Sequence, residues 1–554
     1  MPRSLLLFSV VARAAVAEQI HLSLGGDASS MLVNWASWEE RDSGRVWYRQ
    51  VSESSKWSFE EGSSRVWNYT LKSGGWITED YKSPYLYSTL LRDLEPDSFY
   101  EYYIDDNATK KPRTFKTLKE KYPLTVAVVG DQGQTEFAKE TAEKLLNLTE
   151  SSSPVSERPA FTLFAGDLSY ADGRGPRWDS FANLVEPLYS RLPMMTLPGN
   201  HEIEYEADTG RTFTSYRKRY GRDLVETPEI LNTSSRGHKY HYDVFNYDFG
   251  SSYYSFKVGP AIFLMLNTYA PAENFSYQKT WLEREFYCLD RQKTPWVVVG
   301  MHAPWYSSSR KHRVEDEWAT RQHKANLEKL FIKNKVPLVF AGHVHAYERS
   351  HPVCFQQISA AGPTYITVGD GGNHEGLYDK WSDSSWSAFK DGSSYGFGTV
   401  DFLNDTHARW RWLPNDDQQG NARDDVIVQN LVSLEKKDDD PCDLPLEEDF
   451  DFDCDATDIL QDLRRKINGE NKSSDRQEKT RPPGGSAILT IVLVALAAVS
   501  LALATAYSIT RAQAITPKSL GWTEVDAGLD NDAAVAPHDD DNTVGVDNNN
   551  VEMV

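Results

Sequence analysis

The chain has 554 residues and a formal net charge of −22, and this length is more than one domain needs. The acidity is concentrated, because residues 438–455 hold ten carboxylates without a base and residues 511–554 hold nine carboxylates against two bases. Nucleic acid binding requires clustered Lys and Arg, so the charge pattern argues against nucleic acid as a partner.

Both ends of the chain carry targeting signals. Residues 1–17 combine Arg3, an apolar stretch and the small residues Ala15 and Ala17, a pattern typical of a signal peptide. Residues 487–509 are 23 residues without a charge, enough for one helix to span a bilayer. We therefore expect a single-pass type I membrane protein of the secretory pathway, with an extracellular or luminal catalytic part, an acidic stalk (416–485), a transmembrane helix (486–509) and an acidic cytoplasmic tail (510–554).

Glycosylation sequons and cysteines fit an oxidising compartment. The sequons all fall on the proposed outer side, at Asn68, Asn107, Asn147, Asn232, Asn274, Asn404 and Asn471. Four cysteines allow three disulfide pairings. We predict Cys442 with Cys454 and Cys288 with Cys354.

Residues 18–118 read as strand after strand. Short runs that include Ile20–Leu24, Met31–Trp35 and Tyr85–Leu91 are separated by turn-forming residues. Tyr100 and Tyr102 follow a turn in the manner of the tyrosine corner of fibronectin-like domains. This pattern predicts an all-β, fibronectin III-like sandwich.

From residue 119 to about residue 415, short apolar runs alternate with helical segments, which indicates an α/β domain of mixed sheets flanked by helices. Five of the runs end in polar residues that can bind metal. The runs and the residues that follow them are 125–129 with Asp131, 161–165 with Asp167 and Tyr170, 194–197 with Asn200, 296–299 with His302, and 338–341 with His343 and His345. Ligand sites in open α/β sheets form beyond the carboxyl ends of the strands, so we expect these side chains to gather there.

Seven candidate ligands are enough for two metal ions. Two adjacent ions that share a carboxylate suit phosphoryl transfer to water, since attacking and leaving oxygens are both stabilised. Any one of the aspartates could instead cap a helix or form a turn, but five segments with this pattern make that reading improbable.

The five segments, in this order, resemble the metallophosphoesterase signature, and Tyr170 makes them similar to the purple acid phosphatases. The resemblance covers residues 18–415 and implies a calcineurin-like metallophosphoesterase domain over residues 119–415. It places Asp131, Asp167, Tyr170 and His345 on Fe(III), and Asn200, His302 and His343 on a divalent ion, with Asp167 as the bridge. Tyr phenolate suits iron(III), while imidazole and amide suit Zn, Mn or Fe(II).

The function that the resemblance implies is acid phosphatase activity, in which a metal-bound hydroxide attacks a phosphate monoester and releases orthophosphate. Asn200 and His201 would meet the phosphate, and His201 is a candidate proton donor. The family has a further histidine beyond the fourth segment, and His312 is the candidate for this catalytic and substrate-binding position. Lys311 stands where some members have a second histidine, and it is expected to hold the phosphate electrostatically. Small phosphate esters are the expected partners, and a homodimer is allowed.

Two alternatives stay open. The same scaffold could act as a phosphodiesterase or nucleotide pyrophosphatase, and the loop 211–242, expected to wall the pocket, gives no preference between them. The third reading is a glycosylated surface protein with an inert centre, which the complete set of seven ligands disfavours.

Overall fold

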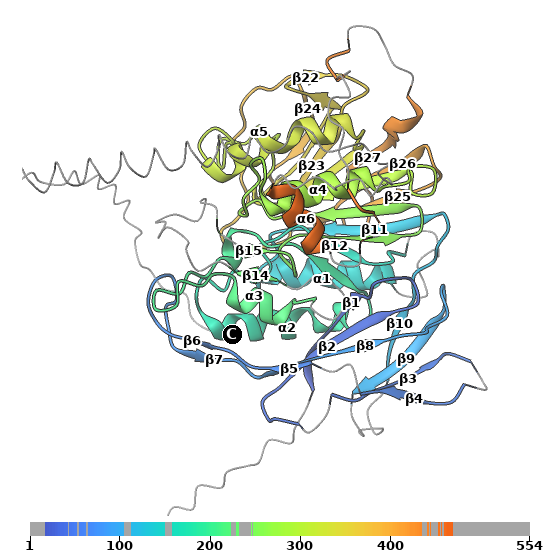
Figure 1. Ribbon diagram of the computed structural model, residues 1–554, viewed down its shortest axis with the longest axis vertical. Coiled ribbons are helices and arrows are strands. Elements are labelled where there is room, and N and C mark those ends of the chain that lie inside the picture. Colours follow the sequence, from blue (N-terminus) through green and yellow to red (C-terminus); the bar gives the residue numbers. More distant parts are fainter. Residues whose placement is uncertain are drawn as a thin grey trace, which may run out of the picture. The chain divides into compact units, whose positions relative to one another are not determined.

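The protein is represented by a computed structural model (Figure 1). The chain divides into two compact units, residues 1–472 and 473–554, and the residues described below belong to the first. They are 17–41, 44–52, 55–61, 65–104, 112–149, 158–222, 229–231, 245, 247–434, 440–442, 444, 452–454, 456 and 459–468. The predicted signal peptide apart from Ala17, the predicted transmembrane helix and the tail lie outside these residues. Among the described residues, we find no helix with the length and apolar character needed to cross a membrane.

The N-terminal domain is the predicted β-sandwich. Its two four-stranded antiparallel sheets are β1 (Glu18–Leu24), β2 (Met31–Ser37), β8 (Tyr85–Leu91) and β5 (Arg65–Trp67), and β10 (Arg113–Lys116), β9 (Phe99–Ile104), β3 (Val46–Gln50) and β4 (Ser58–Glu60). The hairpin of β6 (Thr70–Leu71) and β7 (Tyr81–Lys82) extends from it. The hydroxyl of Tyr100 accepts a hydrogen bond from the backbone N–H of Glu95 at 2.8 Å, which is a tyrosine corner.

The second domain is built on two facing mixed sheets. One contains β13 (Met194–Thr196), β12 (Thr162–Phe164), β11 (Leu124–Val129), β25 (Gly396–Phe402), β26 (His407–Pro414) and β27 (Asp424–Gln429). The other contains β16 (Tyr254–Val258), β17 (Ala261–Met265), β18 (Trp296–Gly300), β19 (Leu338–Ala341), β23 (Thr364–Val368), β20 (Tyr347–Ser350) and β24 (Ser387–Asp391). Strands β11, β12 and β13 run parallel, and so do β17, β18, β19 and β23.

Helices cover the outer faces of both sheets. The α-helices are α1 (Glu136–Thr149), α2 (Gly175–Tyr189), α3 (Thr214–Arg219), α4 (Tyr277–Tyr287), α5 (Trp318–Lys333) and α6 (Ile459–Ile467). Small remaining elements are β14 (Ile230–Leu231) with β15 (Tyr247–Asp248), β21 (Val353–Cys354) with β22 (Gln357–Ile358), and the 3₁₀ turns η2 (Asn200–Glu202) and η3 (Leu431–Ser433). Figure 1 shows α1, α2 and α3 on one side of the paired sheets and α4 and α5 on the other.

Alternating side chains of the central strands fill three hydrophobic layers, because successive residues of a strand face opposite sides. Val126 and Val128 of β11 pack between the two sheets. Ala127 and Val129 of the same strand pack against α1 and α2. All six residues of β11 are buried, and burial on both faces explains why the sequence is apolar except for Thr125.

The predicted disulfide pairing is wrong. The bonds join Cys288 with Cys454 and Cys354 with Cys442. Cys288 caps the end of α4, and α6, which follows Cys454, packs against α4. The C-terminal segment is therefore tied at two points to the α/β domain rather than closed on itself.

The sequence-based boundary of the α/β domain at residue 415 is also too early. Strand β27 pairs with β26 and completes the six-stranded sheet. The backbone carbonyl of Asp453 accepts a hydrogen bond from the Arg284 side chain of α4 at 2.9 Å. Parts of the charged segment expected to be a stalk are thus packed on the domain, because pairing and burial with distant elements outweigh its polar composition.

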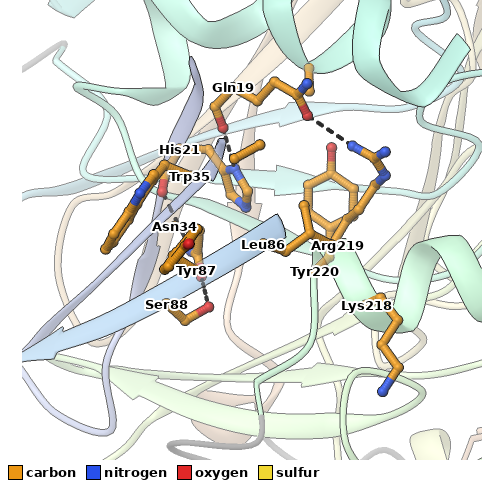
Figure 2. A pocket seen from close by; sticks show the side chains of 12 residues that line it. Gln19, His21, Asn34, Trp35, Leu86, Tyr87, Ser88, Lys218, Arg219 and Tyr220 are labelled. Carbon is orange, nitrogen blue, oxygen red and sulfur yellow. Dashed lines mark hydrogen bonds between the residues drawn. The ribbon is translucent and has the colours of Figure 1, made fainter. Parts of the chain in front are cut away.

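Arg219 of α3 joins the two domains through a buried polar network. Its guanidinium donates to Gln19, Tyr69, Tyr81 and Asp179 at 2.7–2.8 Å, and its side chain is 3% exposed. Figure 2 shows Gln19 and Arg219 beside a cavity between the sandwich and α3. The cavity volume is about 10 Å³, no more than one water molecule needs, so the domains pack closely here.

We expect Arg219→Met to lower the free energy of unfolding by about 3–5 kcal/mol, because it leaves the largely buried Asp179 carboxylate without its cationic partner. Urea unfolding of the purified protein measures this change. The control is Arg409→Met, which breaks an ion pair whose side chains are 42% and 41% exposed and should cost no more than about 1 kcal/mol. Equal effects of the two substitutions would contradict a structural role of the buried network.

Candidate metal centre

The seven predicted ligands come together at the carboxyl ends of the parallel strands. They follow β11, β12, β13, β18 and β19 within six residues of each strand end and converge from both sheets, as Asp131, Asp167, Tyr170, Asn200, His302, His343 and His345. Each of these side chains is at most 5% exposed. The strand order thus brings polar groups from five separate segments into one buried site.

Several ligand positions adopt a left-handed backbone. The φ angles are 53° at Asp131, 50° at Asp167, 50° at Tyr170 and 68° at His343. Residues other than glycine rarely adopt this conformation, and each instance costs on the order of 1–3 kcal/mol. All four positions lie in the loops that follow the strands, where the ligand side chains meet.

Glycines let the ligand loops approach one another. A Cβ atom on Gly342 would lie 2.2 Å from Oδ2 of Asp131, and one on Gly199 would lie 2.1 Å from Oδ1 of Asp167. Only glycine fits at these two positions, because the carboxylates occupy the space that a side chain would fill.

One group of donors is formed by Tyr170, Asp131 and His345. The Tyr170 hydroxyl lies 3.0 Å from Oδ1 of Asp131 and 2.9 Å from Nε2 of His345. Nδ1 of His345 lies 3.1 Å from the carbonyl oxygen of Gly376. A carbonyl only accepts hydrogen bonds, so this contact requires the proton on Nδ1 and leaves Nε2 free to bind a cation.

A second group is formed by Asp167, Asn200, His302 and His343. Nε2 of His302 lies 3.0 Å from Oδ2 of Asp167 and 3.1 Å from Oδ1 of Asn200. Nδ1 of His302 lies 2.8 Å from the carbonyl oxygen of Ala165. This contact again requires the proton on Nδ1 and leaves Nε2 as the nitrogen that can bind a cation. Ligand atoms of Asp167, His302 and His343 all lie within 4.8 Å of one another.

The electrostatics of the site favour bound cations. Burial, together with the nearby carboxylate of Asp167, raises the pKa of Asp131 well above its usual range, although His302 opposes the shift. Burial and the carboxylates of Asp131 and Asp167 likewise raise the pKa of Tyr170 well above its usual value. Cations between these groups would favour the ionised forms. The donor set and its burial therefore fit two metal ions.

His201 lies at the edge of the donor set. Its backbone N–H donates to Oδ1 of Asp167 at 2.8 Å, and its Nδ1 lies 2.5 Å from Oδ1 of Asp172. Burial lowers the pKa of His201, but the carboxylates of Asp167 and Asp172 outweigh burial and raise it to about 10. Asp172 therefore holds the imidazole through Nδ1, the ring nitrogen opposite Nε2.

The predicted substrate residues Lys311 and His312 lie on the loop before α5. Nδ1 of His312 lies 2.8 Å from Oε1 of Glu317. The ammonium of Lys311 lies 4.3 Å from the ring centroid of Tyr378, whose ring stacks on His345 at 4.4 Å. Contacts through Tyr378 and Glu317 thus connect this loop to the ligands. The predicted pocket wall, residues 211–242, lies partly outside the described residues.

Sequence analysis missed the roles of two buried carboxylates. Glu202 accepts hydrogen bonds from the backbone N–H groups of Asp167, Leu168 and Gly199 at 2.8–2.9 Å and so fixes two ligand loops together. Glu317 contacts His312 and His343. Glu202 follows His201 directly in the sequence, which was a usable signal, whereas nothing local distinguishes Glu317 from Glu315 or Asp316.

The sequons fall into two sets. Asn68, Asn147, Asn274 and Asn404 are exposed, so their positions are compatible with glycosylation. Asn107, Asn232 and Asn471 lie outside the described residues. Glycosylation stays a prediction.

Comparisons with known proteins agree with this arrangement. Three family models match: calcineurin-like phosphoesterase over residues 124–347, iron/zinc purple acid phosphatase-like protein C over residues 362–424, and purple acid phosphatase, N-terminal domain over residues 17–117. Purple acid phosphatase 18 of Arabidopsis thaliana is 34% identical over 423 residues, which cover 76% of this chain and 86% of that protein. Phosphoenolpyruvate phosphatase of Allium cepa is 34% identical over 436 residues, covering 74% and 82%.

A solved structure shows the same fold. The purple acid phosphatase PPD1 from yellow lupin seeds superposes with a TM-score of 0.61 over 76% of each chain, at 20% sequence identity.

We expect Gly342→Ala to reduce metal content by more than about tenfold, because the added Cβ would displace the Asp131 carboxylate that faces Tyr170. Metal analysis of the purified protein measures the change. Gly26→Ala is the matched control, since nothing lies within 4 Å of a Cβ there. Full metal content in Gly342→Ala would show that metal binding does not need the close approach of the Gly342 loop to Asp131.

Proposed function

This chain belongs to the purple acid phosphatase family and is a phosphoric monoester hydrolase, and from that membership we propose that it uses a binuclear Fe(III)–M(II) centre to release orthophosphate from small organic phosphates. M(II) is Zn, Mn or Fe(II). The observation that carries the proposal is the division of seven buried donors into two adjacent groups, only one of which contains a phenol.

The two donor groups differ in the charge of the ion they suit. Tyr170, Asp131 and His345 include a phenol whose pKa burial raises well above its usual value, so a strongly charged cation is needed to ionise it, which favours Fe(III). Asn200, His302 and His343 supply neutral donors, which suit a divalent ion. Asp167 belongs to the second group through His302, and its charge also acts on Asp131 of the first, so this one carboxylate could serve both ions. When bound, the ions would activate water and neutralise the phosphate.

The surrounding residues handle the substrate. The His201 imidazole is held by Asp172 at 2.5 Å and faces Tyr170 with ring centroids 4.1 Å apart. From this position it can donate a hydrogen bond to a phosphate oxygen or a proton to the leaving alcohol. His312 and Lys311 face the site from the opposite loop, and the lysine ammonium adds positive charge for an anionic ester.

We further propose that the enzyme is delivered through the secretory pathway and anchored by residues 486–509, with glycans on the outer side. The sequence patterns at both ends support this proposal. Expression of the full chain in a eukaryotic secretory host should give a mature N-terminus at Glu18 and a protein that detergent, but not alkaline carbonate, extracts from membranes. An uncleaved N-terminus or release by carbonate would contradict it.

The metal assignment is tested by colour. Purified wild-type protein should contain iron, absorb visible light and hydrolyse a generic aryl phosphate. Tyr170→Phe should remove the visible band, because the phenolate is the only charge-transfer ligand of the seven, and should lower hydrolysis by more than about tenfold.

Tyr378→Phe is the spectroscopic control, since it removes the hydroxyl of a tyrosine whose ring stacks on His345 and should keep the band. If the band persisted in Tyr170→Phe, the ferric assignment would be wrong. A metal-replete wild-type protein that is colourless and inactive would favour a non-enzymatic surface protein.

A further inference from the structure

The Glu317 carboxylate lies between a predicted metal ligand and a predicted substrate residue. Its Oε1 is 2.9 Å from Nε2 of His343 and 2.8 Å from Nδ1 of His312. Its Oε2 is 3.1 Å from Nε2 of His343 and accepts a hydrogen bond from the Thr320 hydroxyl at 2.9 Å. Glu317 is 4% exposed. One buried carboxylate therefore serves two imidazoles with different expected roles.

These contacts determine which ring nitrogen of each histidine carries the proton and which one can bind another group. An ionised carboxylate only accepts hydrogen bonds, so Nε2 of His343 and Nδ1 of His312 must carry protons. The unprotonated Nδ1 of His343 is then the atom available to the group with Asp167 and His302. In His312 the remaining nitrogen, Nε2, is the one that can meet a phosphate ester.

The His312 position also needs support from outside its own loop. His312 has a left-handed backbone with φ of 53°, which costs on the order of 1–3 kcal/mol. Its ring lies 4.3 Å from the ring of His343 and 5.6 Å from that of Tyr378. The contact of its Nδ1 with Oε1 of Glu317 ties His312 to the start of α5.

We propose that Glu317 is a positioning residue that couples the divalent-ion ligand His343 to the substrate residue His312, so that the divalent ion and the phosphate ester strengthen each other's binding. This inference rests on the proposed function. A carboxylate behind a ligating histidine raises the basicity of the ring and fixes its orientation. Because the same oxygen holds His312, an ion on His343 and a substrate on His312 both favour one arrangement of Glu317.

Glu317→Gln in the full chain tests the proposal. The neutral amide keeps the size of the side chain but loses the charge, so we expect the affinity for the divalent ion to fall about 10–100-fold. Iron content and the visible band should not change, because Tyr170, Asp131 and His345 make their contacts with other groups. With excess divalent ion, kcat should recover while KM for an aryl phosphate stays raised.

Two further variants distinguish positioning from general support of the fold. Glu315→Gln makes the same chemical change two residues away, at a side chain that is 68% exposed, and should leave metal affinity and KM within about twofold of wild type. In a His312→Ala background, Glu317→Gln should raise KM no further, because it acts on substrate through His312.

Different results would contradict the coupling role of Glu317 and the proposed function. Unchanged divalent-ion affinity in Glu317→Gln, joint loss of iron and the divalent ion, or additive effects on KM would each overturn the coupling role. A wild-type protein without iron and the visible band would instead overturn the proposed function.

Discussion

The constraint on which the structure depends is the burial of two carboxylates and a phenol at one end of two facing mixed sheets. Asp131, Asp167 and Tyr170 are at most 1% exposed, and unpaired buried charges are among the most costly features a fold can contain. Two facing sheets direct imidazoles from β18 and β19 onto acidic groups from β11 and β12. The left-handed loops, the close approach at glycines and the backbone hydrogen bonds that Glu202 accepts all help to hold that convergence.

Much of the architecture could be predicted because local patterns determine it. Residues of β11 and β19 are buried on both faces, so their sequences are continuous apolar runs that end where the strand ends. Since parallel strands place their carboxyl ends at one edge, polar residues after each run could be expected to meet. Those residues are in contact, but their division into two groups does not follow from the strand, since Asp167 and Tyr170 both follow β12 and lie in different groups.

What the sequence did not reveal depends on contacts between distant segments. Cys454 lies closer in sequence to Cys442 than to Cys288, yet packing of α6 on α4 brings Cys288 to it. Strand β27 was taken for the start of a stalk because only its pairing with β26 shows that it belongs to the sheet. Glu317 has two acidic neighbours with the same local appearance, and only the position of β19 across the site shows which of the three is buried.

The N-terminal sandwich supplies no ligand, but its contacts reach the loops that carry the site. The backbone N–H of Thr78 donates to the carbonyl of Gly173 at 3.1 Å, one residue from Asp172, which holds His201. The N–H of Trp76 donates to the carbonyl of Tyr205 at 2.9 Å, in the loop that follows His201. Both the carboxylate and the imidazole of this pair are therefore anchored by the same hairpin, β6 to β7. A domain that supplies none of the seven donors can in this way help to fix the position of His201 relative to Asp172.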